Sequence, residues 1–167
     1  NEPNDRQITR QLYGGDSLLR LQQEMVLGVG GVRALRAAGL SPQVWHINEG
    51  HAAFQIVERI RELVAAGVEF NAAVEAVAAC TVFTTHTPVP AGIDRFPLDL
   101  VERYFGWWCE ATGVEMSTLL QLGDEPGGVA VFVYSGAPPE PLLETIERER
   151  LTPTHILRTH SHADDVE

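Results

Sequence analysis

The sequence predicts an α/β fold in which a small, mostly parallel sheet is flanked by helices. Two short apolar runs, Val44–Ile47 and Val82–Phe83, have the composition of buried strands. Each run passes into a polar cluster that holds a histidine, followed by Gly or Pro and then by an apolar pattern at helical spacing. Because strands that alternate with helices pair in parallel through crossover connections, this order favours an α/β sheet. Strands are predicted at residues 43–48, 81–85, 129–134 and 154–159.

The first predicted helix is long. It should begin at Asp16 or Ser17, either of which can cap a helix, and end before Gly39, as is usual for a C-terminal glycine. The glycines of Gly28–Gly31 interrupt its apolar stripe. They predict either close packing against a neighbouring element or a break in the helix.

The second predicted helix, Ala52–Ala66, is amphipathic. Its apolar face should be buried and consists of Phe54, Val57, Ile60, Leu63 and Val64. Its charged face is predicted to be an ordinary solvated surface and consists of Glu58, Arg59, Arg61 and Glu62. Further helices are predicted over Phe70–Ala79, after Pro97 and over Met116–Leu122.

Two adjacent tryptophans, Trp107 and Trp108, lie in the helix predicted after Pro97. Aromatic faces suit sugar rings, so the pair could form a carbohydrate-stacking platform. Their helical spacing with other apolar positions favours a place in the core or at a domain interface instead.

Composition narrows the class of protein. The chain has 167 residues, the length of one domain, and its 44% hydrophobic content is enough to bury a core. A net charge of −11 without a basic stripe argues against nucleic acid and anionic membranes as partners. We find no signal region and no stretch that suits a membrane span, so the sequence predicts a cytoplasmic protein with Cys80 and Cys109 reduced.

The two polar clusters predict a binding site. Ligands of open α/β sheets bind where the carboxyl ends of parallel strands meet, because the loops there converge. His51 and His86 follow the two predicted strands and are the titratable side chains that such a site would use. The alternative is that both are ordinary loop histidines, one of them capping a helix.

Three segments of the chain have a distinctive sequence: Asn48–Phe54 (N-E-G-H-A-A-F), Thr84–Phe105 (beginning T-T-H-T-P-V-P-A-G-I-D-R-F) and Leu12–Glu24. Together they resemble the N-terminal half of the α-glucan (glycogen, starch) phosphorylases, over about residues 5–123. The resemblance implies a partial Rossmann-like domain of the glycosyltransferase-B type. It also implies an activity, the cleavage of an α-1,4-glucan by phosphate to glucose 1-phosphate, and pyridoxal phosphate as the cofactor.

The resemblance assigns roles to five residues. His86 would be the catalytic-site residue that contacts the glucosyl unit at the cleavage point. Asn48, Glu49 and His51 would bind the α-glucan or oligosaccharide from the neighbouring loop, with Asp94 behind them. However, all 12 basic residues are Arg and none is Lys, so this chain cannot hold pyridoxal phosphate as a Schiff base. We therefore predict that the chain alone is inactive.

The remainder of the chain differs in character. Residues 1–123 form the predicted phosphorylase-like domain, 124–128 a linker, and 129–167 a short α/β tail. The tail resembles the start of a metallo-β-lactamase-superfamily domain, whose zinc ligands would correspond to His160, His162 and Asp164. An unligated state is favoured, because three ligands on one terminal segment cannot close a tetrahedral zinc site.

Three functions follow from these patterns. The leading hypothesis is part of a glucan phosphorylase that retains some of its glucosyl-binding surface. The alternatives are a truncated metal-dependent hydrolase, based on the tail, and a non-catalytic orphan domain. A partial domain would also expose an apolar sheet edge, which predicts self-association.

Overall fold

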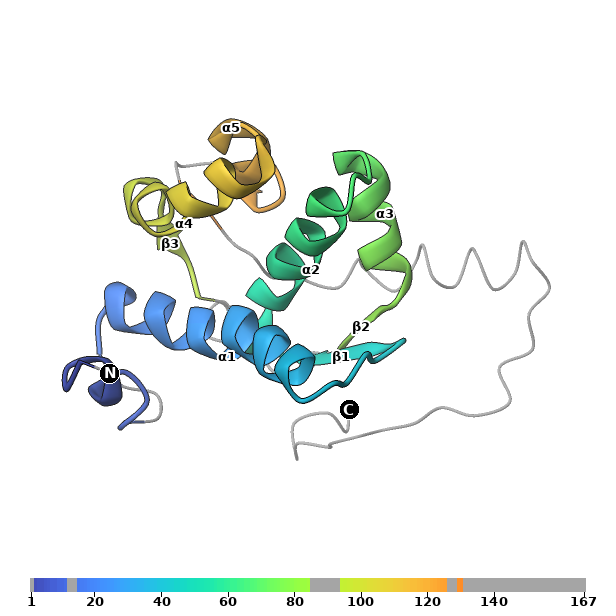
Figure 1. Cartoon of the computed structure of the whole chain (residues 1–167). Helices are drawn as coiled ribbons and strands as arrows, with labels where there is room; N and C mark the ends of the chain where they lie inside the picture. Colours follow the sequence, from blue (N-terminus) through green and yellow to red (C-terminus); the bar gives the residue numbers. More distant parts are fainter. Residues whose placement is uncertain (1, 12–14, 85–93, 126–128, 131–167) are drawn as a thin grey trace, which may run out of the picture.

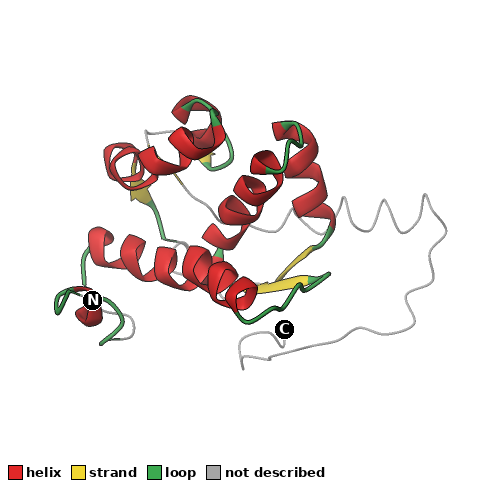
Figure 2. Ribbon diagram, in the orientation of Figure 1, coloured by secondary structure: helices red, strands yellow, loops and turns green. Residues whose placement is uncertain are grey.

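The computed structural model describes residues 2–11, 15–84, 94–125 and 129–130. Predictions that fall elsewhere, including those for His86 and for the tail residues His160, His162 and Asp164, lie outside the described residues. Figure 2 shows that helices make up most of the described chain and that its strands are short.

A parallel two-stranded sheet confirms the predicted α/β class. β1 (Trp45–Asn48) pairs with β2 (Thr81–Thr84), so that Trp45 lies opposite Thr81 and Asn48 opposite Thr84. Between the strands, the chain forms a short 3-10 helix, η2 (Gly50–Ala52), then α2 (Phe54–Ala65) and α3 (Phe70–Ala79). This is the strand–helix–strand order that the sequence predicts, and both strands end at the same edge of the sheet.

A second, antiparallel sheet contains three short strands. β3 (Phe96–Pro97) and β4 (Asp124–Glu125) flank β5 (Val129–Ala130). The sequence left open whether the strand predicted from residue 129 joins the first two strands. In the described part of that strand, Val129 pairs with Pro97 and Glu125 instead, and residues 124–125 of the predicted linker form β4.

The long first helix, α1 (Ser17–Ala37), is unbroken. Asp16 caps it, because its carboxylate accepts a hydrogen bond from the backbone N–H of Leu19 at 2.9 Å. Gly28 provides the close packing that its position predicts. A Cβ built there would lie 2.7 Å from the backbone nitrogen of Gln55, so α1 approaches α2 more closely than an L side chain allows. In the described N-terminal residues, the only element that precedes α1 in the chain is a short 3-10 helix, η1 (Asp5–Gln7).

The core lies where α1, α2 and α4 (Leu98–Thr112) meet, with α5 (Met116–Leu120) beside α4 (Figure 1). The rings of Phe54 and Phe105 lie 4.9 Å apart between centroids. Trp108 is fully buried, and its indole N–H donates to the carbonyl of Val57 at 3.0 Å. Trp108 is therefore a core residue, as the helical spacing favours, whereas Trp107 is only partly buried and lies under the guanidinium of Arg33.

The charged face of α2 is not the solvated surface that its pattern predicts. Glu58 is 0% exposed and accepts hydrogen bonds from Arg33 of α1 and from Arg61. Arg59 is 5% exposed and lies over the ring of Trp45, with its guanidinium 2.6 Å from Cys80 Sγ. The prediction for these two residues is wrong because α1 and the β1–β2 sheet cover flanks of α2 that helical periodicity alone assigns to solvent.

Two further observations concern the cysteines and the possibility of a membrane span. Cys80 and Cys109 are free and half-buried. Among the described residues, no helix combines the length and the apolarity that crossing a lipid bilayer requires. The predictions of self-association and of a cytoplasmic location stay predictions.

Candidate functional site

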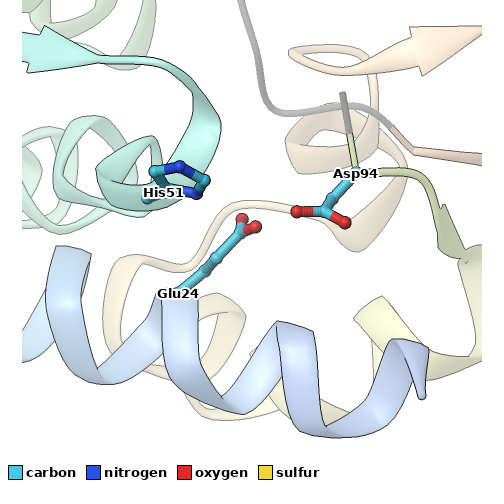
Figure 3. Close-up of side chains that lie close together, drawn as sticks. All are labelled: Glu24, His51 and Asp94. Carbon is cyan, nitrogen blue, oxygen red and sulfur yellow. The ribbon is translucent and has the colours of Figure 1, made fainter. Parts of the chain in front are cut away.

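Three side chains converge at the edge of the parallel sheet. Glu24 comes from α1, His51 from η2 and Asp94 from the segment before β3, and Figure 3 shows them directed toward one another. Their ligand-type atoms all lie within 4.8 Å of one another. Residues separated by up to 70 positions in the chain, Glu24 and Asp94, thus meet in one polar cluster.

β1 and η2 position His51. The backbone N–H of Glu49 donates to the carbonyl of Thr84 at 2.8 Å, so the chain leaves β1 beside the end of β2. The ring of His46 reinforces this pairing, since its Nε2 lies 2.7 Å from the hydroxyl oxygen of Thr84. The turn of η2 then brings His51 back toward α1.

Arg20 connects all three members of the cluster. Its Nη2 lies 2.5 Å from Oδ2 of Asp94, and its Nε donates to the same oxygen at 3.2 Å. Nη2 also lies 3.4 Å from Nδ1 of His51 and 3.5 Å from Oε1 of Glu24. The Arg20 side chain is only 15% exposed, which strengthens these charge-assisted contacts relative to a solvated pair.

Glu24 holds a proton at neutral pH. Burial, with Glu24 only 3% exposed, raises the pKa of its carboxyl from 4.5 to about 9, and the hydrogen bond and charge of Asp94 add to the rise. The nearby charge of Arg20 acts in the opposite direction but does not outweigh them. The contact between Arg20 and Glu24 at 3.5 Å is therefore a hydrogen bond to a neutral acid, not an ion pair.

Asp94 is the charged partner. Burial alone would raise the pKa of its carboxyl, but the hydrogen bonds from Arg20 and Glu24 and the positive charge of Arg20 outweigh burial and lower the pKa. One carboxyl is protonated and the other ionised, which is the arrangement expected of two acids that share a desolvated site. The pair therefore presents one negative charge, and Arg20 balances it.

Glu24, His51 and Asp94 have the ligand atoms of a cation site, but together with Arg20 they lack the net negative charge that such a site needs. Two carboxyls and an imidazole can ligate a divalent ion. Here the guanidinium of Arg20 already neutralises Asp94, and Glu24 is neutral at pH 7. The cluster therefore offers no net negative charge to a cation, and hydrogen bonding to a neutral polar ligand suits it better.

A pocket of about 450 Å³ lies beside the cluster. Arg20, Glu24 and His51 contribute polar groups to its lining, and Leu27, Gly31 and Ala34 of α1 contribute apolar surface. No neighbouring heavy atom lies within 4 Å of a Cβ built on Gly31, so this glycine leaves space open. Such a mixture of a few polar groups and an apolar wall is typical of small-molecule sites.

Glu49 has a strained backbone. Its φ of 55° and ψ of −166° lie in a region that is nearly restricted to glycine, at a cost of about 1–3 kcal/mol for other residues. Strain of this kind is found at functional sites, where the retained side chain has a role that glycine could not fill. The position supports the prediction that Glu49 belongs to a binding site.

Replacing Glu49 separates this strain from the side chain's contacts. We expect Glu49→Gly to be more stable than Glu49→Ala by about 1–2 kcal/mol, since both lose the carboxylate but only glycine relieves the backbone. Urea unfolding followed by circular dichroism measures the difference. Equal stabilities of the two variants would show that the backbone at residue 49 is not strained in solution.

The structure describes four of the five residues that the phosphorylase resemblance assigns. It brings His51 and Asp94 together and places Glu49 two residues away from His51, between β1 and η2. Asn48 ends β1, exposed and opposite Thr84. His86 lies two residues beyond Thr84, outside the described residues.

Sequence reasoning missed Arg20 and Glu24. They are four residues apart on α1, a spacing that also marks ordinary surface ion pairs. One signal could have found them. Both fall within Leu12–Glu24, the upstream stretch that resembles the phosphorylases, although no chemistry had been assigned to it.

Three known proteins are similar to this chain over part of its length. A glycogen phosphorylase of Mycobacterium tuberculosis (strain CDC 1551 / Oshkosh) is 56% identical over 110 residues, which are 62% of this chain and 13% of that protein. A maltodextrin phosphorylase of Thermococcus litoralis is 44% identical over 125 residues, 75% of this chain and 15% of that protein. A glycogen phosphorylase of Aquifex aeolicus is 34% identical over 126 residues, 75% of this chain and 18% of that protein. No family model matches the chain.

These similarities support a phosphorylase-family region in this chain and confirm the resemblance over that part of it. The chain spans only 13% to 18% of the length of these three relatives. The activity and substrates of a whole phosphorylase are therefore matters for proposal.

Proposed function

We propose that this chain is part of an α-1,4-glucan phosphorylase and retains part of its glucosyl-binding surface. We call this surface the glucosyl wall and define it by the described residues Asn48, Glu49, His51 and Asp94. The observation that carries the proposal is the joint contact of Arg20 with His51 and Asp94, at 3.4 and 2.5 Å. It joins two segments of phosphorylase-like sequence at the edge of the sheet where ligands of α/β folds bind.

The chemistry of the glucosyl wall suits a sugar. Hydroxyl groups of a glucosyl unit both donate and accept hydrogen bonds, and they need partners of both kinds. Asn48 offers an amide, Glu49 a carboxyl and His51 a ring nitrogen at one edge of the sheet. The balanced charge of Arg20 and Asp94 leaves this surface polar without a strong preference for ions. His86, two positions beyond Thr84 in the sequence, is the proposed contact at the cleavage point.

The family's cofactor does not fit this chain. In the phosphorylases that the chain resembles, pyridoxal phosphate is anchored as a Schiff base, which requires a Lys amine. The sequence contains no Lys, so no residue here can form that bond. The function that we propose for the chain by itself is therefore sugar binding, and phosphorolysis belongs to a whole enzyme.

Titration with a maltooligosaccharide tests the proposal. We expect ring signals of His51 and His86 to shift together in NMR spectra as maltoheptaose is added to the chain. Affinity should be millimolar at best, about −4 kcal/mol, because only part of a phosphorylase site is present. The rings of His155, His160 and His162 serve as internal controls and should not move. Shifts confined to those three rings, or no shifts at saturating sugar, would refute the glucosyl wall.

A further inference from the structure

We propose that Arg20 is a positioning residue, whose guanidinium holds His51 and Asp94 in the one arrangement that forms the glucosyl wall. This inference rests on the proposed function, because it explains how residues from separate segments come to act on one ligand. Arg20 comes from α1, and its side chain is 15% exposed.

The geometry of the guanidinium carries the argument. Two of its nitrogens, Nε and Nη2, donate to the same oxygen of Asp94, which fixes the plane of the fork. Its Nη1 donates to Oε1 of Gln23 at 3.3 Å, and this contact anchors the other side of the fork to α1. With the plane fixed at both sides, Nη2 can reach Nδ1 of His51 at 3.4 Å only when the ring is turned toward α1.

The contact with His51 also bears on the tautomer of its ring. A guanidinium has donors and no acceptor, so Nδ1 of the neutral ring must accept from Nη2. Nε2 of the neutral ring then carries the proton. Arg20 thus acts on a ligand by holding the ring of His51 in one tautomer and orientation.

Glu24 and Gln23, which also belong to α1, accept hydrogen bonds from the guanidinium of Arg20. Oε1 of Glu24 accepts from Nη2 at 3.5 Å, and its neutral carboxyl does not compete with Asp94 for the charge of Arg20. Gln23 is itself held by the carbonyls of Ile8 and Gln11, at 2.8 and 2.9 Å. The N-terminal residues and α1 therefore brace Arg20 before any ligand binds. A lysine could supply the charge of Arg20 but not its planar, many-donor fork.

The experiment compares Arg20→Gln and Arg20→Lys with Arg36→Gln in the full 167-residue chain. Arg36 is the matched control, because it also joins α1 to α2, through Glu62, at 2.9 Å, but lies away from the cluster. Two readouts are measured: the ¹⁵N shift of His51 Nδ1 without sugar, and the affinity for maltoheptaose. The ring of His46, held by Thr84, is the internal reference.

We expect both Arg20 variants to move the His51 Nδ1 signal toward that of an imidazole without a hydrogen bond. We expect Arg20→Gln to weaken maltoheptaose binding about tenfold, Arg20→Lys to weaken it less, and Arg36→Gln to bind within about twofold of the unmodified chain. If the backbone amide signals of Arg20→Gln lose their chemical-shift dispersion, that variant is unfolded. The test then uses Arg20→Lys and Asp94→Asn in its place, and Asp94→Asn should also shift the Nδ1 signal of His51.

Unchanged His51 signals in the Arg20 variants would overturn the positioning role, whatever the sugar affinity. Equal loss of binding in Arg36→Gln would overturn it too, because the effect would then come from weaker packing of α1. If the unmodified chain binds no sugar while the His51 signal moves as expected, the proposed function fails and the positioning of His51 by Arg20 stands.

Discussion

Replacing Glu24 with Gln should remove a steep loss of stability with rising pH. In the unmodified chain, the free energy of unfolding should fall by about 1.4 kcal/mol per pH unit across the range from about pH 5 to pH 8. In Glu24→Gln this slope should be nearly absent. The variant should therefore be the more stable protein at pH 8, by a few kcal/mol.

The sign follows from the protonation of Glu24. Burial, reinforced by Asp94, raises the pKa of its carboxyl from 4.5 to about 9 in the folded chain. Between these two values the folded state holds a proton that the unfolded state has released, so each step up in pH favours unfolding. The stabilising effect of the proton is complete below about pH 4.5 and is lost by about pH 9. A glutamine is neutral at every pH and can still donate to Asp94.

Urea unfolding at half-unit pH intervals measures these slopes. Glu75→Gln is the control, because Glu75 is an exposed carboxyl on α3, far from the cluster in sequence, and the steep slope should persist in that variant. A Glu24→Gln chain with the same slope as the unmodified protein would show that Glu24 is ionised at neutral pH. The balance of charge in the cluster, and with it the argument for a neutral ligand, would then be wrong.

Trp108→Ala should cost about 3–5 kcal/mol of stability, the range found when a buried Trp or Phe is truncated. Trp108 is 0% exposed, and its ring packs edge-to-face on that of Phe70, with 6.4 Å between the ring centroids. Its indole N–H donates a hydrogen bond to the carbonyl of Val57. Truncation would leave a cavity between α2 and α4 and remove the hydrogen bond from the indole to the Val57 carbonyl. Since the total free energy of unfolding of a domain of this size is only about 5–15 kcal/mol, the variant should be barely folded at 37 °C.

Trp107→Ala is the matched control for this prediction. Trp107 is only partly buried and lies under Arg33, so its truncation should cost roughly 1 kcal/mol. Trp108→Phe keeps a ring in the core and should fall between the two. Chemical unfolding monitored by far-UV circular dichroism gives all three values. A larger loss from Trp107→Ala than from Trp108→Ala would mean that α4 presents the opposite face to the core.

The sequence predicts much of the fold because its local signals agree with one another. Asp16 is a good cap followed by a long apolar stripe, and the resulting helix begins at Ser17. The apolar runs around Ile47 and Phe83 form the parallel pair. Helical periodicity fails at Glu58 and Arg59, because it has no information about α1 and the sheet, which cover them. Burial of charged residues depends on partners distant in sequence, such as Arg33 for Glu58.

The candidate site is predictable only in part for the same reason. His51 follows a strand end, where α/β folds bind ligands, so its position alone marks it. Arg20 and Glu24 lie in a helix, where their spacing is equally typical of a solvated pair. Their roles depend on Asp94, 74 positions beyond Arg20. The raised pKa of Glu24 likewise follows from burial and a second carboxyl, neither of which a one-dimensional pattern contains.

The central claim is that sugar contacts the edge of the sheet where His51 and Asp94 meet. Intermolecular nuclear Overhauser effects between maltoheptaose and the side chains of the full chain test it most directly. The account predicts cross-peaks from glucosyl protons to the ring protons of His51, with the rings of His155, His160 and His162 as negative controls. Cross-peaks to those control rings but none to His51, at sugar concentrations that saturate the chain, would contradict it.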